Sequence, residues 1–288
     1  MECRIIKGKP VADKITEELS SEVKNLKYKG ISPKLAILRV GERPDDMSYE
    51  RGAVNRCSKI DIGVEKVILD ADVSQEDYIK ELKKLNEDES VDAILCLRPL
   101  PKNINENIVK NIINPVKDVD CFSPINTAKV FEGDKTGYAP CTSEAVIEIL
   151  KYYDVKMNGA KAVIIGRSMV VGKPVSILLM NENATIKVCH SRTKDIEKEA
   201  SDADIVIAAL GKAKKINSEF IKEGAVVIDV GINVDEDGNL CGDADTEDVS
   251  KKASMITPVP GGVGSVTTSV LAKHIVKACK LQRESRGE

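Results

Sequence analysis

The chain has 288 residues, which at roughly 150 residues per domain predicts two domains with ample chain for a large core. Its 43 basic and 46 acidic residues are nearly balanced, so we expect no basic surface of the kind that binds nucleic acid or a membrane. No apolar stretch approaches the roughly 18 residues of a membrane span, and the first residues lack the apolar core of a signal peptide, so we expect a cytoplasmic protein.

The cysteines argue against both a disulfide framework and a metal site. Eight of them are scattered along the chain without a Cys-x-x-Cys pair, and no histidine cluster completes a ligand set. Several fall in apolar, strand-like runs. We therefore predict buried thiols in a reducing compartment and no bound metal.

The first 113 residues alternate between helical and strand patterns. Apolar residues recur at helical spacing from Pro10 to about Tyr28, and Ser74 followed by Asp77 has the pattern of a helix cap. The predicted helices are residues 10–28, 46–60, 74–86 and 105–113, and the predicted strands are 34–40, 64–69 and 91–97. This β-α-β-α-β series predicts a parallel sheet with helices over it.

The second half begins after a turn-rich connection expected at residues 127–140, and Thr142 is expected to cap a helix that reaches about Tyr153. Buried strands are then predicted at residues 160–165, 184–188, 203–210 and 225–230. They indicate a doubly wound, Rossmann-like sheet. A last helix, residues 267–281, is expected to pack on the first domain. The predicted fold is α/β with two domains, residues 1–139 plus about 268–288 and residues 140–267.

Two glycine-containing segments of the second domain are candidate ligand loops. A strand ends at Gly166 before a helix expected from about Val170, and amide groups at a helix N-terminus favour a phosphate. Five residues separate Gly166 from Gly172, so the turn is not the G-x-G-x-x-G fingerprint, and alone it is equally typical of any α/β protein. Three glycines and two prolines fix an irregular backbone at residues 257–264, which exposes polar backbone groups to a flat ligand.

Several stretches together resemble the methylenetetrahydrofolate dehydrogenase/cyclohydrolase family, in its order and spacing across nearly the whole chain. The matching pieces are Val40-Gly41 with Pro44 and Tyr49, Pro99-Leu-Pro101, Lys117-Asp-Val-Asp120, Pro140-Cys-Thr142, Gly166-Arg-Ser168 with Val171-Gly172 and Pro174, Asp229-Val-Gly231, and Thr257-Pro-Val-Pro-Gly-Gly-Val-Gly264. The resemblance implies a cleft between the domains, with a reduced folate on the N-terminal catalytic domain and NADP on the C-terminal one. Hydride would pass from the one-carbon methylene bridge to the nicotinamide.

The resemblance also implies roles for individual residues at the folate. Asp120 would hydrogen-bond the pterin ring, and Tyr49 would stack on or hydrogen-bond the folate. From the residues alone, Asp120 is also compatible with a loop or cap acid and Tyr49 with an ordinary half-buried aromatic. The further residues assigned to the substrate are Leu97, Pro99, Pro260, Gly261 and Gly262.

The cofactor residues implied by the resemblance are Gly166, Arg167, Ser168, Gly172, Ser191, Arg192, Gly231 and Ile232. Arg167 and Ser191 match the positions that hold the 2′-phosphate in NADP-using members. Arg192 adds a second guanidinium, and no acidic residue stands there to prefer a free ribose hydroxyl, so NADP is favoured over NAD. His190 is predicted to be structural.

The chain departs from the family pattern where the second activity, hydrolysis of the methenyl product, is concerned. The family places a lysine four residues after the tyrosine, and Ala53 lacks the amine that would move protons at the attacking water. Arg56 is the only basic side chain on that helical face, and a guanidinium stays protonated. Leu97 replaces the glutamine that steadies the lysine. We therefore predict a dehydrogenase of one-carbon folate metabolism with little or no cyclohydrolase activity.

Smaller departures, Cys121 for a glycine and Ser143 and Ser265 for prolines, leave hydride transfer untouched. Three different functions remain possible: a fully bifunctional enzyme, a non-catalytic paralogue that binds folate or NADP, and another two-domain NADP oxidoreductase acting on a hydroxy or amino acid. The last usually needs a lysine or histidine base, and no candidate stands out. The resemblance further suggests a homodimer formed through the second domain.

Overall fold

The computed structural model describes residues 2–287, which form two compact units. The N-terminal unit comprises Lys14–Cys141 and the residues from Thr268 on, and the C-terminal unit comprises the residues up to Asp13 and Thr142–Thr267. The expected division differs from this one mainly at the start of the chain. The residues up to Asp13 join the C-terminal unit because β1 (Arg4–Ile5) pairs with β11 (Met255–Ile256), and two-residue strands carry no periodicity.

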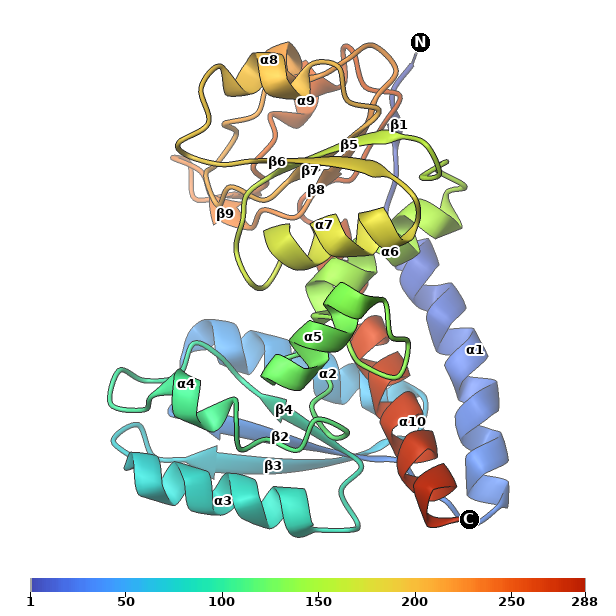
Figure 1. The fold of residues 1–288 in the computed structure, drawn as a ribbon, viewed down its shortest axis with the longest axis vertical. Helices are drawn as coiled ribbons and strands as arrows, with labels where there is room; N and C mark the ends of the chain where they lie inside the picture. The colour runs from blue at the N-terminus through green and yellow to red at the C-terminus, as the bar shows by residue number, and fades with distance from the viewer. Residues whose placement is uncertain (1, 288) are drawn as a thin grey trace. The chain divides into compact units, whose positions relative to one another are not determined.

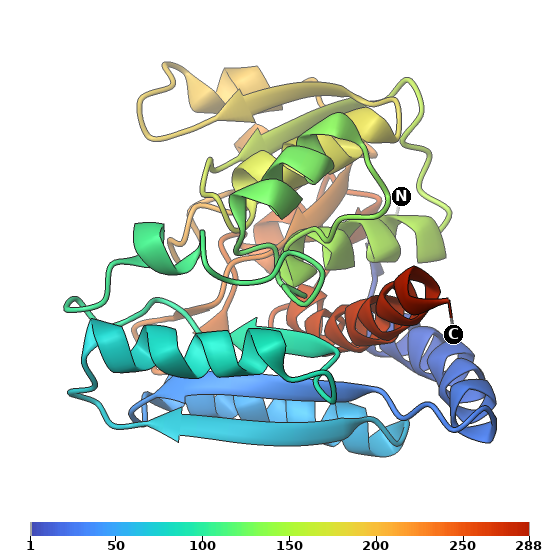
Figure 2. The same ribbon diagram turned by 60° about the horizontal axis from the view of Figure 1, so that its bottom comes forward.

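The N-terminal unit contains the predicted parallel sheet, with strand order β3-β2-β4. Its strands are β2 (Lys34–Val40), β3 (Gly63–Leu69) and β4 (Ala93–Cys96). Side chains alternate across the sheet, so Leu38 packs against α3 (Gln75–Glu87) while Arg39 points toward α2 (Pro44–Lys59). Figure 2 shows α3 and α2 on opposite sides of these strands.

Two helix predictions for this unit are confirmed by specific contacts. Ser74 caps α3 by accepting a hydrogen bond from the Asp77 amide at 3.1 Å. The last helix, α10 (Thr267–Arg286), packs on the first domain as expected, and the side-chain amide of Gln282 donates to the Asp92 carbonyl at 2.7 Å. The long helix near the N-terminus, α1, spans Gly8–Tyr28.

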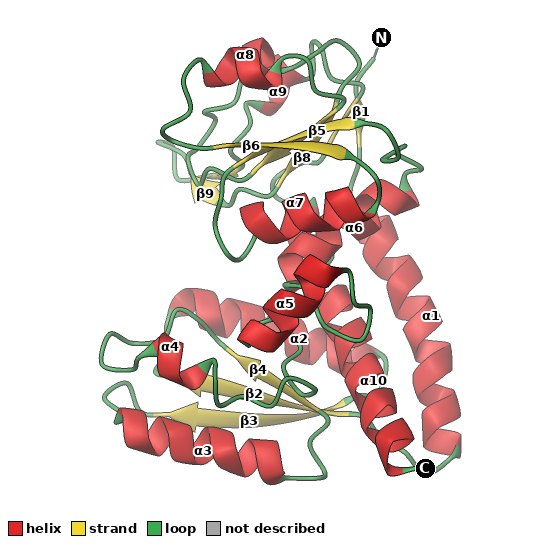
Figure 3. Cartoon of the chain, viewed as in Figure 1, coloured by secondary structure: helices red, strands yellow, loops and turns green. Residues whose placement is uncertain are grey.

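Two predictions for the segment before the boundary are wrong. The helix expected at residues 105–113 is only α4 (Glu106–Val109), because the Asn111 side chain takes the Asn107 carbonyl that would continue it. The connection expected at residues 127–140 is preceded and partly replaced by a helix, α5 (Pro124–Glu132), visible in Figure 3. Ser123 caps α5, Pro124 occupies its first turn, and Gly133 ends it with φ of 72°.

The C-terminal unit is a doubly wound sheet, which confirms the predicted fold class. Six parallel strands follow the order β1-β11-β8-β7-β5-β6, so the chain moves outward from β5 in both directions. Helices cover both faces (Figure 1). The remaining elements are α6 (Cys141–Tyr152), β5 (Lys161–Ile165), α7 (Gly172–Asn181), β6 (Thr185–Cys189), α8 (Ile196–Ala200), β7 (Ile205–Ala208), β8 (Val226–Asp229), α9 (Thr246–Val249), two 3₁₀ turns (Ser218–Phe220 and Val263–Ser265) and an unpredicted hairpin of β9 (Asn233–Val234) and β10 (Leu240–Cys241).

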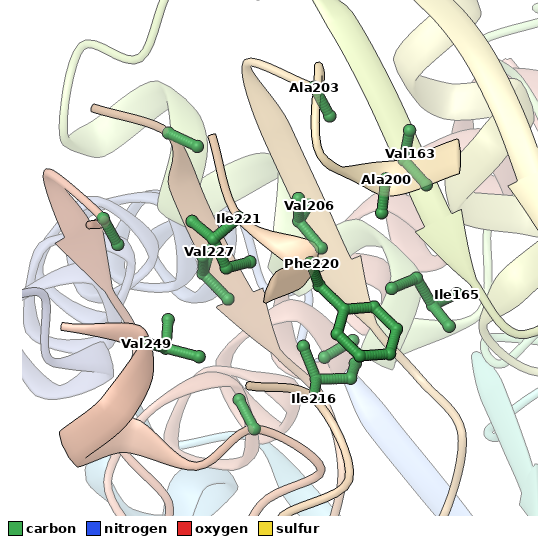
Figure 4. Packing of buried hydrophobic residues seen from close by; sticks show 14 of the residues in the cluster. Val163, Ile165, Ala200, Ala203, Val206, Ile216, Phe220, Ile221, Val227 and Val249 are labelled. Carbon is green, nitrogen blue, oxygen red and sulfur yellow. The ribbon is translucent and has the colours of Figure 1, made fainter. Parts of the chain in front are cut away.

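An apolar cluster fixes the strands of this sheet. Val163, Val206 and Val227 are neighbours in the strand register, and Ile216 and Phe220 pack with them in the same cluster (Figure 4). All five side chains are nearly or fully buried. The strand ends, from which the candidate cofactor loops leave, are therefore held by a close-packed layer.

All eight cysteines are free thiols, and six of them are buried as predicted. Cys3 and Cys121 are half-buried, because Cys3 precedes the edge strand β1 and Cys121 lies in a loop with a φ of 55°. Within residues 2–287, no helix combines the length and apolar character required to cross a bilayer. The same residues contain no group of three or more histidine, cysteine, aspartate or glutamate side chains arranged to hold a metal ion.

Candidate active site

Helix α2 carries Tyr49, and the next residue anchors this helix to the sheet. The buried carboxylate of Glu50 accepts hydrogen bonds from Arg39 of β2 at 2.8 Å and Lys66 of β3 at 2.9 Å. Burial opposes ionisation, but these two cations hold the pKa of Glu50 below its usual value. Tyr49 therefore lies on a helix that is anchored to the sheet.

Arg43 ties the start of α2 to the segment that follows β4. Its guanidinium donates to the carbonyls of Pro99 at 2.9 Å and Arg98 at 3.1 Å, and it pairs with Asp46 of α2 at 2.6 Å. Arg43 thus connects the segment of Pro99 to the helix of Tyr49 through hydrogen bonds.

Asp120 is held at both carboxylate oxygens. Oδ1 accepts a hydrogen bond from the Cys141 amide at 2.9 Å, and Oδ2 pairs with Arg98 Nη2 at 3.3 Å. The Arg98 guanidinium also lies over the Phe122 ring, 4.6 Å from its centre. Because 24% of the Asp120 side chain stays exposed, the oriented carboxylate remains accessible to a ligand.

Tyr49 belongs to the same group of side chains. Burial raises the pKa of its hydroxyl well above the usual value; Cys141 and Asp120 add to this shift, and the Arg98 charge opposes it. The phenol is therefore protonated at neutral pH and available as a donor, with the Cys141 side chain as one hydrogen-bond partner. The structure thus brings together Tyr49 and Asp120, two residues that the resemblance assigns to the folate.

One helical turn beyond Tyr49, the position of the family lysine carries a methyl group. Ala53 is fully buried. Arg56 Nη1 donates to Thr16 Oγ1 of α1 at 2.5 Å, so this guanidinium is engaged elsewhere. Leu97 is also buried and has no polar side-chain atom. Neither Ala53 nor Leu97 can therefore carry a proton.

The candidate cofactor residues follow strand ends that share one edge of the six-stranded sheet, because the strands are parallel. Ligands of doubly wound sheets bind along this edge. The residues are Gly166, Arg167, Ser168 and Gly172 after β5, Ser191 and Arg192 after β6, and Gly231 and Ile232 after β8.

The turn after β5 requires glycine at position 166. Gly166 has φ of 141°, and a Cβ atom there would lie 2.1 Å from the Ala209 carbonyl oxygen. Ser168 Oγ accepts hydrogen bonds from the amides of Val171 at 3.1 Å and Gly172 at 3.4 Å, at the start of α7. The expected phosphate turn thus passes tightly against the neighbouring loop.

The side chains available beside this turn fit a ribose 2′-phosphate. Arg167, Ser191 and Arg192 are all exposed. No carboxylate occurs between Cys189, at the end of β6, and Asp195. Two guanidinium groups and a hydroxyl without a competing acid suit a phosphate dianion better than a free hydroxyl.

The end of β8 presents Ile232, with 71% of the residue exposed, while Gly231 is buried and donates to the Asp229 carboxylate at 2.9 Å. Pro260, Gly261 and Gly262 follow β11 in the C-terminal unit, and the Gly261 carbonyl accepts from the Gly8 amide at 2.8 Å. The other residues predicted to contact the folate lie in the N-terminal unit, namely Tyr49, Leu97, Pro99 and Asp120. Contact of one folate with residues of both units therefore stays a prediction.

Two family models match the chain. The model of the "Tetrahydrofolate dehydrogenase/cyclohydrolase, catalytic domain" matches residues 6–120, and the model of the corresponding "NAD(P)-binding domain" matches residues 140–283. The chain belongs to the tetrahydrofolate dehydrogenase/cyclohydrolase family. The resemblance inferred from the motifs is thereby confirmed, as are the NAD(P)-binding type of the second domain and membership of an enzyme family.

Relatives of this family match the chain over nearly its whole length. "Bifunctional protein FolD" of Clostridioides difficile is 63% identical over 97% of both chains, and that of Alkaliphilus oremlandii is 60% identical over 96% of this chain and 98% of its own. The Campylobacter jejuni FolD crystal structure has a TM-score of 0.94 at 40% identity, covering 97% of this chain and 99% of that one. The Trypanosoma brucei FolD structure, complexed with NADP cofactor and inhibitor, has a TM-score of 0.92 at 37% identity, covering 98% and 99%.

Three residues that the structure places in contact with the candidate site were not among the predicted site residues. Arg98 is a single charge between apolar Leu97 and a proline, which is a signal that sequence reading could have used. Cys141 lies inside a matched motif, but its amide contact with Asp120 has no local pattern. The carbonyl partners of Arg43 are 55 and 56 residues away, so its role is visible only in the structure.

Proposed function

We propose that the protein oxidises methylenetetrahydrofolate to methenyltetrahydrofolate with NADP, and that its cyclohydrolase activity is weak or absent. Family membership supports the reaction class. The cluster of Tyr49, Arg98 and Asp120 supports a folate site in the N-terminal unit, because it offers an oriented acceptor and a protonated donor.

In this proposal the chain acts mainly by holding its ligands. Bound NADP supplies the nicotinamide that accepts the hydride. Asp120 accepts hydrogen bonds from donor groups of the pterin ring, and the Tyr49 hydroxyl orients the folate. The product cation is stabilised by its own nitrogens, so the protein need not move a proton during this step. Orientation then supplies most of the rate increase.

The side chains on the loops after β5 and β6 favour NADP over NAD. Arg167, Ser191 and Arg192 are exposed there without a competing carboxylate. A 2′-phosphate adds charge-assisted hydrogen bonds to such a set, whereas a ribose hydroxyl would usually be met by an acid. We expect a KM for NADP at least about tenfold below that for NAD, because such bonds contribute roughly 1.5–3 kcal/mol.

The observation that carries the cyclohydrolase part is Ala53, fully buried where the resemblance expects a lysine. Attack of water on the methenyl carbon requires a group that can take a proton, and Leu97 and the engaged Arg56 cannot supply it. The relatives at 60–63% identity are named bifunctional, so a fully bifunctional enzyme is the principal competing function.

The test follows the methenyl absorbance in two assays. With methylenetetrahydrofolate and NADP, the absorbance should rise and persist. When methenyltetrahydrofolate is added directly, it should decay at the buffer rate with or without protein. Decay that is proportional to protein concentration would establish a bifunctional enzyme. The variant pair Ala53→Lys and Ala53→Lys/Leu97→Gln asks whether the missing side chains are also sufficient.

A non-catalytic paralogue and an oxidoreductase of another substrate class would each give a different outcome in these assays. The paralogue would bind NADP in calorimetry but produce no methenyl absorbance. The oxidoreductase would leave methylenetetrahydrofolate unchanged and reduce NADP with one member of a panel of hydroxy and amino acids.

We also expect a cytoplasmic homodimer. The eight free thiols support a reducing compartment. In the C-terminal unit, Val234 and Leu240 of the β9–β10 hairpin are 62% and 53% exposed, and they offer an apolar surface of the kind that a second copy can cover. Light scattering after size-exclusion chromatography should give twice the mass of the chain, and a Val234→Glu/Leu240→Glu variant should give the monomer mass.

A further inference from the structure

Two buried carboxylates interlock the loops that leave β7, β8 and β10. Asp243 is fully buried, and its oxygens accept hydrogen bonds from four donors. Oδ2 accepts from the amides of Leu210 and Gly211, the second at 2.9 Å, and Oδ1 accepts from the Lys212 amide at 2.8 Å and the Asn233 side chain at 2.9 Å. One side chain thereby fixes the segment after β7 and the start of β9.

Asp229, the last residue of β8, completes the arrangement. Its carboxylate accepts from the amides of Gly231 at 2.9 Å, Asp243 at 3.0 Å and Ala244 at 2.8 Å. Space allows only glycine at two points. A Cβ atom at Gly242 would lie 1.9 Å from Asp229 Oδ2, and one at Gly231 would lie 2.4 Å from the Asp243 carboxylate.

The exposed Ile232 sits between two residues that this pair holds. The amide of Gly231, before it, is bound by Asp229, and the side chain of Asn233, after it, is bound by Asp243. Ile232 is the residue that we assign to the nicotinamide side of the cofactor. An exposed aliphatic side chain whose two neighbouring residues are held in place can meet a flat ring with little ordering of its backbone on binding.

We propose that Asp243 is a positioning residue for the nicotinamide half of the dinucleotide: it holds Ile232 and the segment 210–212 at the carboxyl edge of the sheet. The adenosine half is met by a different set, Arg167, Ser191 and Arg192, on the loops after β5 and β6, to which none of the four donors to Asp243 belongs. This inference rests on the proposed NADP function. It goes further by dividing the carboxyl edge of the sheet into two regions, in which different residues bind the two halves of the dinucleotide.

The experiment measures binding of two probes to the full-length protein by calorimetry: NADP, and 2′,5′-ADP, which keeps the adenosine and 2′-phosphate but lacks nicotinamide. Asp243→Asn turns an amide hydrogen toward backbone N–H donors. We expect the Kd for NADP to rise about tenfold or more, while the Kd for 2′,5′-ADP stays within about twofold. Equal loss for both probes, or no loss for either, would overturn the inference. Failure of the unaltered protein to bind NADP would instead overturn the proposed function.

Two further variants keep the result decisive. Asp248→Asn is the matched control, because Asp248 also accepts a backbone hydrogen bond, from Ser218 at 2.7 Å, and pairs with the exposed Lys251. It should lower stability but leave both Kd values unchanged. If Asp243→Asn does not fold, Asn233→Ala removes one of the four donors with less disturbance. It should raise the Kd for NADP about threefold and leave 2′,5′-ADP unaffected; unchanged binding of both probes would refute the proposal.

Discussion

The two units of the molecule hold buried carboxylates close to a candidate site residue in opposite ways. In the N-terminal unit, Glu50 is neutralised by side-chain cations, Arg39 and Lys66, from two strands. In the C-terminal unit, Asp229 and Asp243 are surrounded mainly by backbone N–H groups. Each arrangement fixes a candidate site residue on the adjoining backbone, Tyr49 in the first and Ile232 in the second.

The difference is in what each arrangement fixes and in how it responds to pH. Cations on strands can anchor a helix as a rigid body, whereas amides of several loops can be drawn together only by an acceptor placed among them. Full cations lower the pKa of Glu50 in spite of burial, but burial outweighs three amides at Asp229 and raises its pKa to about 6. The two anchors therefore favour stability at opposite ends of the acidic range.

The largest effect should come from breaking the cationic anchor. Glu50→Gln leaves the nearly buried Arg39 guanidinium without its counterion, and we expect a loss of about 3–5 kcal/mol in the unfolding free energy of the N-terminal unit. Urea unfolding followed by circular dichroism measures this change. The matched control is Glu65→Gln, which breaks a half-exposed pair with Lys34 and should cost less than about 1 kcal/mol. Equal costs for the two variants would show that burial of Arg39 is unimportant.

Local sequence patterns predict the longer strands and the long helices well, because each of these elements carries its own apolar pattern. Strand β2 lies at the residues predicted, because a short and nearly continuous apolar run such as residues 35–40, with Arg39 as its one charge, is typical of a strand buried inside a sheet. Helix α5 was missed for the converse reason. Its large apolar side chains, Ile125 and Phe131, are 53% and 68% exposed, so no core-facing stripe marks it, and only Ser123 and the proline after it signal a start.

The site residues are less predictable than the fold, because their partners are distant in sequence. The ends of β5, β6, β7 and β8 could be read from apolar runs, which is why the cofactor candidates share one edge. The donors to Asp243, in contrast, come from residues 210–212 and 233, and no periodicity connects them to an aspartate after β10. The pair of Arg98 and Asp120 likewise spans 22 residues.

A smaller effect on the unfolding free energy, with the opposite dependence on pH, is expected at Asp229. Its carboxyl group keeps a proton in the native state up to about pH 6 but only to about pH 4 when unfolded. Its contribution to stability is therefore complete below about pH 4 and is lost as the pH rises through 6. The Asp229→Asn variant cannot titrate, so the difference in unfolding free energy, unaltered protein minus variant, should fall by about 2 kcal/mol between about pH 4.5 and 7.5.

The Glu50→Gln variant supplies the contrast in the same titration. The pKa of Glu50 is lowered, so its contribution is present above about pH 4.5 and is lost as the pH falls, and the corresponding difference should grow with pH. Urea unfolding at several pH values measures both. Differences that move in the same direction for the two variants would contradict the distinction between cation and amide anchors.

The smallest effect is expected at Asp120, which uses both kinds of partner, the Arg98 guanidinium on one oxygen and the Cys141 amide on the other. Arg98→Leu removes the cation and leaves the amide in place. Since both side chains of the pair are partly exposed, we expect about a threefold rise in KM for methylenetetrahydrofolate, with the KM for NADP unchanged. Added salt should raise the KM of the unaltered protein more than that of the variant, because the variant lacks the ion pair that salt screens. Lys129→Met, which breaks another partly exposed pair, with Asp134, is the control. A rise in the KM for methylenetetrahydrofolate beyond about a hundredfold would mean that Arg98 binds the folate directly. A KM that Arg98→Leu leaves unchanged at every salt concentration would mean that the amide alone orients Asp120.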